Sequence, residues 1–226
     1  MKGADLEALW LTLRLAALVT GLLIVLATPL AWWLARSRSR LAPVVEALTA
    51  LPLVLPPTVI GFYLLLAFAP TAPIGGLWVQ MTGKTLSFSF VGLVIASLFY
   101  SLPFSVQPLQ SAFGLLGRAP IEAAASLGAR PLDAFLSVAV PLSLRGYLAA
   151  GVLTFAHTLG EFGVVLMVGG NIPGQTRVIS VALYEEVERL DYGSAHRLSA
   201  LLLVLSFSVL LVLYLLNARA GRHDRA

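Results

Sequence analysis

The residues that could perform chemistry in this 226-residue chain are few, and they do not form an enzyme site. Cysteine is absent, which excludes disulfides and thiolate metal ligands. Histidine occurs only as His157, His196 and His223, which are too scattered in sequence to suggest a metal cluster. The chain has no G-x-x-x-x-G-K-[ST] phosphate loop, so we expect any ATP hydrolysis to occur on another protein. We therefore expect no cofactor in this chain and no enzymatic activity.

The composition places these residues in a membrane. Hydrophobic residues make up 58% of the chain and charged residues only 12%, whereas soluble domains have about 25% charged residues. So little charge cannot cover a water-exposed surface of this size, which predicts an integral membrane protein with one domain, residues 1–226. We read the net charge of +4 as the arginine asymmetry that orients membrane proteins, and not as a sign of nucleic-acid binding.

Five regions are apolar enough to cross a bilayer, which takes about 20 helical residues. The fold class is therefore all-α, a polytopic transmembrane helical bundle. The fourth region would be roughly 50 Å long as one helix, so we expect either a tilt or a break, with the break near Gly160 or Gly163. The five predicted spans are residues 15–34, 47–69, 86–113, 136–168 and 198–216.

Arginines set the predicted orientation. Arg36, Arg38 and Arg40 follow the first span directly, and such clusters stay in the cytoplasm. With five crossings, the N-terminus is then outside and the C-terminus inside. The cytoplasmic side also holds the loop 118–135 and the tail with Arg219, Arg222 and Arg225.

The loop 118–135 carries helix start and stop signals. Pro120 suits a first helical turn, and Glu122 favours the positive end of the helix dipole. Alanines 123–125 have high helix propensity and little bulk, and Gly128 can adopt the left-handed conformation that ends a helix. These signals predict a short helix with a flat face that another protein can approach closely. Taken alone, they fit a well-capped surface turn equally well.

The spacing of these residues resembles the EAA loop of ATP-binding-cassette importer permeases. Glu122, Ala123 and Ala124 are followed after three residues by Gly128, and Pro141 closes the motif, with valines where the family has isoleucine and leucine. The resemblance implies that this helix couples the chain to a separate ATPase, which binds ATP and magnesium. Arg118 and Arg130 flank the helix and either pair with acidic residues of the ATPase or simply anchor the loop.

Two further stretches narrow the resemblance. Residues 51–66 and 158–177 resemble the corresponding segments of molybdate permeases of the ModB type. The resemblance is weaker in the first span and after residue 178. It implies a type I importer permease in a bacterial or archaeal cytoplasmic membrane, with two permease copies, two ATPases and an external binding protein. The implied substrate is molybdate, with tungstate close to it and sulfate as the alternative.

Prolines mark a candidate gate in the second span. Pro52, Pro56 and Pro57 interrupt helical hydrogen bonding and leave carbonyls free. Such backbone is tolerated at membrane depth where it is buried in protein or faces a watery cavity. We therefore expect this span to line the pathway and bend at a gate, with a static kink as the alternative.

Glu161 is the second gate candidate. Acidic residues within a span are costly and point to function, and Gly160 and Gly163 beside it allow close helix contacts. A carboxylate repels oxyanions, so we expect a gate or hinge element and not a substrate ligand. The alternative is an interfacial residue that pairs with Arg177 or caps a half-helix.

A turn on the outer side is the candidate docking site for the binding protein. Asn171, Pro173 and Gly174 predict this turn, and Arg177 beside it could contact the binding protein or the arriving anion. The acidic stretch 184–191 predicts a short interfacial helix, with a part in docking as the alternative.

Two other classes of protein fit the sequence less well. A gradient-driven transporter would carry paired charges or a proton relay at the membrane midplane, but four of the five spans contain no charge at all. An intramembrane enzyme would need an HExxH motif, paired aspartates or a serine elbow, and none occurs.

Overall fold

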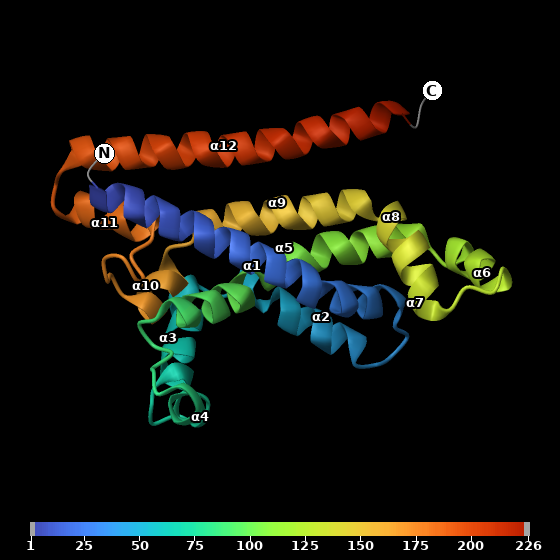
Figure 1. Cartoon of the computed structure of the whole chain (residues 1–226), viewed down its shortest axis with the longest axis horizontal. Coiled ribbons are helices and arrows are strands. Elements are labelled where there is room, and N and C mark those ends of the chain that lie inside the picture. The colour runs from blue at the N-terminus through green and yellow to red at the C-terminus, as the bar shows by residue number, and fades with distance from the viewer. Residues whose placement is uncertain (1–2, 224–226) are drawn as a thin grey trace.

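A computed structural model describes residues 3–223, with side chains described up to residue 215. Over this range the chain forms helices joined by turns, without a β-strand (Figure 1). The predicted all-α fold is confirmed. The side chains of Arg219, Arg222 and Arg225, which were predicted to be cytoplasmic, lie outside the described residues.

Three long helices form the centre of the bundle. They are α1 (Gly3–Arg36), α5 (Phe90–Leu116) and α9 (Leu144–Gly160), and each packs against the other two. Small residues permit this closeness: a Cβ added at Gly146 of α9 would lie 2.3 Å from the Ala112 Cβ of α5. On α1, Ala27 and Ala31 are fully buried in the same contact region.

The last helix, α12 (Tyr192–His223), packs along α9 and forms one side of the bundle (Figure 1). Asp191 caps its start, because the Asp191 Oδ1 accepts a hydrogen bond from the Ser194 N–H at 3.0 Å. Most of its apolar side chains, such as Leu203 and Phe207, are exposed within the chain. Such a surface suits contact with lipid.

Among the described residues, three helices are long and apolar enough to cross a membrane, or up to five segments if each of two bent helix pairs is one span. The straight ones are α1, α5 and α12. They contain the predicted first, third and fifth spans almost entirely. Helix α1 begins well before residue 15, because the charges near its start end the apolar run without ending the helix.

The predicted second span, residues 47–69, is bent, as its prolines predict. It consists of α2 (Ala42–Ala50), η1 (Leu51–Leu53) and α3 (Pro57–Phe68), and the two halves meet at 107°. Pro56 is extended (φ −55°, ψ 135°), because the residue before a proline avoids helical geometry. Helix α3 and the following α4 (Pro73–Thr82) consequently leave the bundle sideways (Figure 1).

The predicted fourth span, residues 136–168, is bent and broken. The chain forms α7 (Pro131–Ala134), η2 (Phe135–Ala139) and α8 (Val140–Leu142), and then turns by 71° into α9. Helix α9 ends at Gly160 and α10 (Gly163–Gly169) follows, so the expected break near these glycines is confirmed. The bend at Ser143 was not expected.

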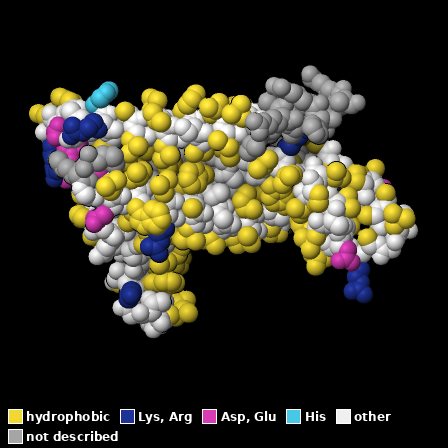
Figure 2. All heavy atoms as spheres, turned by 45° about the horizontal axis from the view of Figure 1, so that its top comes forward, with side chains coloured by type: hydrophobic (Ala, Val, Ile, Leu, Met, Phe, Trp, Pro, Cys, Tyr) yellow, Lys and Arg dark blue, Asp and Glu magenta, His cyan; other side chains and the backbone are white. Residues whose placement is uncertain are grey.

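The two ends of the bundle gather different loops. The loop after α1, the short helix α6 (Ala119–Ser126) and the C-terminus lie at one end, whereas the N-terminus and α11 (Ile179–Glu188) lie at the other (Figure 1). Charged side chains also concentrate toward the ends, and apolar ones cover the face between them (Figure 2). This arrangement groups the loops as the arginine pattern predicts.

Candidate coupling helix, gate and outer turn

Helix α6 is the predicted short helix, and it stands away from the bundle (Figure 1). Pro120 lies in its first turn and Glu122 follows, as expected from their helix-start preferences. None of its residues is buried, and the adjacent Leu127 is 90% exposed. Within this chain the helix therefore presents an open surface.

Gly128 ends this helix in a Schellman motif. The Ala129 N–H donates to the Ala124 carbonyl and the Gly128 N–H to the Ala125 carbonyl, both at 3.0 Å. Gly128 has φ +89°, and a Cβ there would meet no atom of this chain within 4 Å. The backbone requires glycine, while the space beside it is free for a partner.

An aromatic cluster connects this loop to the bundle. Phe135 of η2 lies edge-on to Trp32 of α1, with ring centroids 4.9 Å apart, and also contacts Phe113 of α5. Phe113 in turn packs on Trp32 and on Tyr147 of α9. Pro141 lies in α8, between this cluster and the bend at Ser143. A displacement of α6 and α7 would therefore reach all three central helices.

The structure brings two gate candidates into contact. Pro57 begins α3 and Gly163 begins α10, and a Cβ added at Gly163 would lie 2.7 Å from the Pro57 Cβ. One turn further along α3, a Cβ at Gly61 would lie 2.8 Å from the Met167 Cβ. Glycines on both helices thus allow α3 and α10 to cross at close range.

The other gate candidates lie nearby but outside this contact. Pro52 lines an apolar groove of about 430 Å³ together with Tyr63 and Phe99, and Pro56 forms the corner of the 107° bend. A Cβ at Gly160 would meet nothing within 4 Å, so this glycine is not needed for packing within the chain.

Glu161 is buried at the break between α9 and α10, with 5% of its surface exposed. Its backbone carbonyl accepts a hydrogen bond from the Ser180 Oγ at 2.5 Å, but neither carboxylate oxygen has a hydrogen-bond partner among the described residues. The alternative that it pairs with Arg177 is wrong, because Arg177 pairs with Glu185 instead. The alternative that it caps a half-helix is confirmed for its backbone: Glu161 is the C-cap residue of α9, and its N–H donates to the Thr158 carbonyl.

Hydroxyl groups continue from Glu161 along the contact between α5 and α9. Ser101 Oγ lies 3.0 Å from both His157 Nδ1 and Thr158 Oγ1, and Ser105 Oγ lies 2.7 Å from Thr154 Oγ1. The His157 ring stacks on an aromatic ring of α5 at a centroid distance of 3.9 Å. These contacts give His157 a structural part in the packing of α9 against α5.

The turn that was predicted to lie on the outer side, residues 170–177 and called the outer turn below, is closed by its own hydrogen bonds. Gly174 has φ +72°, and the Ile172 carbonyl accepts hydrogen bonds from the N–H groups of Gln175, Thr176 and Arg177. The Thr176 hydroxyl donates to the Gly169 carbonyl at 2.6 Å. The predicted turn at Asn171, Pro173 and Gly174 is therefore present.

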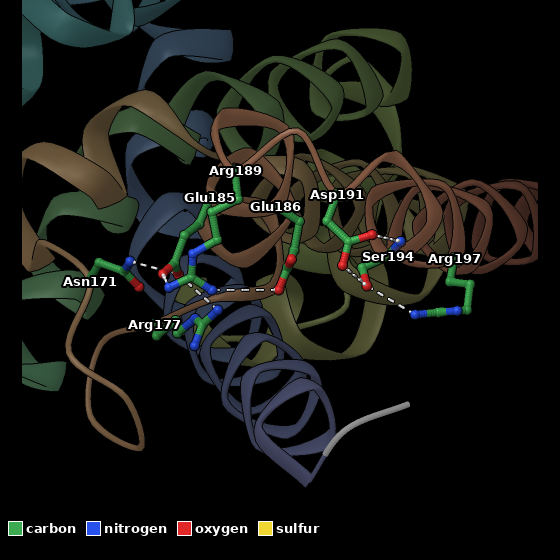
Figure 3. Close-up of polar contacts among 8 residues, drawn as sticks. All are labelled: Asn171, Arg177, Glu185, Glu186, Arg189, Asp191, Ser194 and Arg197. Atoms are coloured by element: carbon green, nitrogen blue, oxygen red, sulfur yellow. Dashed lines mark hydrogen bonds and ion pairs between the residues drawn. The ribbon is translucent and has the colours of Figure 1, made fainter.

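Glu185 of α11 holds this turn, as Figure 3 shows. The Asn171 Nδ2 donates to the Glu185 Oε2 at 3.0 Å, and the Arg177 Nη2 lies 2.8 Å from the same oxygen. Arg189 pairs with the other oxygen of Glu185 and, at 3.9 Å, with Glu186. The predicted helix at 184–191 is only partly present, because α11 covers Ile179–Glu188 and residues 189–191 are not helical. Its anchoring of the turn was missed because the sequence shows only the Glu185–Arg189 spacing.

The Glu185 anchor gives the outer turn a testable pH dependence. The Asn171 hydrogen bond lowers the pKa of Glu185; partial burial opposes it, and Arg177 and Arg189 reinforce it. A carboxyl group whose pKa is lower in the folded state than in the unfolded state stabilises the fold. This stabilisation is fully present above the unfolded-state pKa of about 4.3 and is lost as the pH falls through the folded-state pKa. Hydrogen exchange, corrected for the intrinsic rate, should therefore show protection in residues 170–178 at neutral pH that declines progressively as the pH falls below about 4.3.

Glu185→Gln should reduce this protection already at neutral pH, because the amide removes the charge partner of Arg177 and the nearer of the two charge partners of Arg189. Glu188→Gln is the matched control, since Glu188 lies on the same helix but faces Tyr184. Equal loss of protection in the two variants would contradict the anchoring by Glu185.

Comparison with solved structures shows the same fold in chains of two ATP-binding-cassette transporters. The chain superimposes on the MetNI methionine transporter with a TM-score of 0.71 and 16% identity, covering 93% of both chains. A bacterial transporter involved in alginate import gives a TM-score of 0.73 and 15% identity, covering 98% of this chain and 80% of the other.

Residues 27–222 match the model of the family described as binding-protein-dependent transport system inner membrane component, and the chain belongs to this family. It is similar to permeases of the ModB type. The molybdenum transport system permease protein ModB of Azotobacter vinelandii is 55% identical over 93% of both chains, and that of Mycobacterium tuberculosis is 40% identical over 90% of this chain and 76% of the relative. The sulfate permease CysT of Salmonella typhimurium is 33% identical over 85% and 69%.

Proposed function

We propose that this chain is the permease subunit of an ATP-driven molybdate importer in a bacterial or archaeal cytoplasmic membrane. The observation that carries the substrate is the 55% identity to a molybdenum permease over 93% of the chain, against 33% for sulfate permeases. Tungstate is included, because it forms the same kind of tetrahedral dianion. Sulfate is the alternative substrate.

The exposed helix α6 supports coupling to a separate ATPase. Glu122, Ala123 and Ala124 lie on a helix with no buried residue, and Gly128 ends it where the surrounding space is free. Two ATPase subunits bind ATP and magnesium, and this chain holds no cofactor. ATP-driven closure of the ATPases draws the two α6 helices together, and Phe135 transmits the motion to α1 and α5.

Two copies of the chain form the pathway in this proposal. The groove containing Pro52 and the exposed Tyr63 of α3 provides an apolar face toward the second copy, since α3 leaves the bundle of its own chain. The N-terminus lies outside with the turn at Asn171, Pro173, Gly174 and Arg177, where the binding protein docks. The C-terminus and α6 lie in the cytoplasm, and no nucleic acid is involved.

Reconstitution in proteoliposomes tests the function. The chain is co-expressed with a candidate ATPase and a candidate binding protein from the same organism, and ATPase activity and uptake are measured with molybdate, tungstate and sulfate. Stimulation and uptake with molybdate or tungstate support the proposal, whereas uptake of sulfate alone establishes the alternative. Uptake without ATP that follows an imposed proton or sodium gradient would overturn the ATP-driven mechanism.

A further inference from the structure

An arginine-lined pocket lies where α1 ends, between this end and the residues that directly precede α6. Its volume is about 300 Å³, at the lower end of the roughly 300–1,000 Å³ typical of small-ligand sites. Three of its lining residues carry a positive charge, and none of its lining residues is acidic. The lining residues are Ala35, Arg36, Ser37, Arg38, Phe113, Gly114, Gly117 and Arg118.

Arg36 is fixed at the base of this pocket. Its guanidinium lies over the Trp32 ring at 3.6 Å, and its Nη2 donates to the Gly117 carbonyl at 3.1 Å. Its Nε is buried and has no hydrogen-bond partner among the described residues. A guanidinium has five N–H donors, so Arg36 keeps unused donors in a fixed orientation.

The charges around Arg36 are not balanced within the chain. Arg118 is close enough to repel it, and Glu122 is close enough to attract it. Among the described residues, no ion pair is found for Arg36, Arg38 or Arg118. A bound anion would relieve the repulsion between Arg36 and Arg118 and could also be contacted by Arg38, which lines the same pocket.

We propose that this pocket binds a tetrahedral oxyanion, supplied either by the phosphate of an anionic lipid headgroup or by a free anion such as phosphate or molybdate. Guanidinium groups match such oxygens with paired hydrogen bonds. The pocket lies at the end of a membrane-spanning helix, where basic pockets between helices bind lipid phosphates.

The occupant would connect two parts of the chain. Arg36 and Arg38 belong to the end of α1 and the loop after it, whereas Arg118 directly precedes α6. An anion held by all three therefore ties the start of the coupling helix to α1. This inference does not depend on the proposed substrate, because the site lies on the coupling side and its binding can be measured without transport.

Binding is measured on the full-length chain with named probes. Native mass spectrometry counts molecules of phosphatidylglycerol retained by the detergent-solubilised protein. Equilibrium dialysis of the chain in phosphatidylcholine nanodiscs measures radiolabelled inorganic phosphate and molybdate. The test variant combines Arg38→Gln with Arg118→Gln, which are exposed and leave the partly buried Arg36 in place. The control combines Arg40→Gln with Arg130→Gln, which remove the same charge from the same loops outside the pocket.

The test variant is expected to bind the probe at least about tenfold more weakly than the wild type, a loss of about 1.4 kcal/mol, while the control stays within about twofold. Retention of phosphatidylglycerol alone assigns the site to a lipid headgroup, and binding of phosphate or molybdate assigns it to a free anion. The proposal is overturned if the wild type binds none of the probes, or if the control weakens binding as much as the test variant does.

Discussion

Gly128→Glu is expected to leave the protein in the membrane but to reduce recovery of the ATPase in a co-purified complex by at least about tenfold. Two effects combine at this position. The backbone at φ +89° costs a residue with a side chain about 1–2 kcal/mol. The added carboxylate also points into space that is empty in this chain and that the docked ATPase would fill, and burying an unpaired charge costs several kcal/mol.

Two other variants separate these effects. Gly128→Ala adds the backbone strain with little bulk and should reduce recovery only mildly. Gly83→Glu is the matched control, because Gly83 also ends a helix, has φ +69° and is surrounded by free space, but lies at the end of α4. If Gly83→Glu lowered ATPase recovery as much as Gly128→Glu, general instability would explain the loss. Full recovery and full uptake in Gly128→Glu would contradict the coupling function of α6.

Gly163→Ala is expected to reduce substrate-stimulated ATPase activity and uptake by about tenfold while the complex still assembles. The added methyl group would lie 2.7 Å from the Pro57 Cβ, so α3 and α10 must move apart. Overpacking of this kind typically costs 1–3 kcal/mol, which is enough to shift an equilibrium between two gate conformations by tenfold. ATPase activity and uptake are measured on reconstituted complexes, and the subunit stoichiometry of these complexes measures assembly.

Gly160→Ala is the matched control for this prediction. It makes the same change three residues away, where the new methyl group would meet nothing within 4 Å, and should retain activity within about twofold. Adding Pro57→Gly to Gly163→Ala removes the opposing Cβ and should restore part of the activity. Equal activity of Gly160→Ala and Gly163→Ala would show that the contact does not matter, and loss of assembly would show that it serves packing and not gating.

The features that could be predicted from the sequence depend on local rules. Long uncharged stretches located α1, α5 and α12, because burying charge in lipid is costly. The limits of α6 followed from Pro120 and Gly128, whose backbone preferences are intrinsic. The break after Gly160 followed from length alone, since no single helix of that extent fits a bilayer.

The features that were missed depend on tertiary contacts. Pro56 and Pro57 indicate that a helix stops, but the 107° between α2 and α3 is set by packing of α3 on α10. Arg177 was paired with Glu161 as an alternative because both are near the fourth span. The fold instead buries Glu161 and brings Glu185 to Arg177 from the next helix. Only the folded chain shows which charges meet.

The aromatic cluster around Phe135 has a mechanical consequence. Its ring contacts join the segment that follows α6 and α7 to α1, α5 and α9. In the proposed coupling, a displacement of α6 and α7 would pass to the three central helices through these contacts. Ring contacts without net charge are not screened by salt, whereas contacts between exposed charges weaken as ionic strength rises. If the proposed coupling is correct, the part of the motion that passes through the ring contacts should not depend on salt, whereas contacts through Arg36, Arg38 and Arg118 should weaken as ionic strength rises.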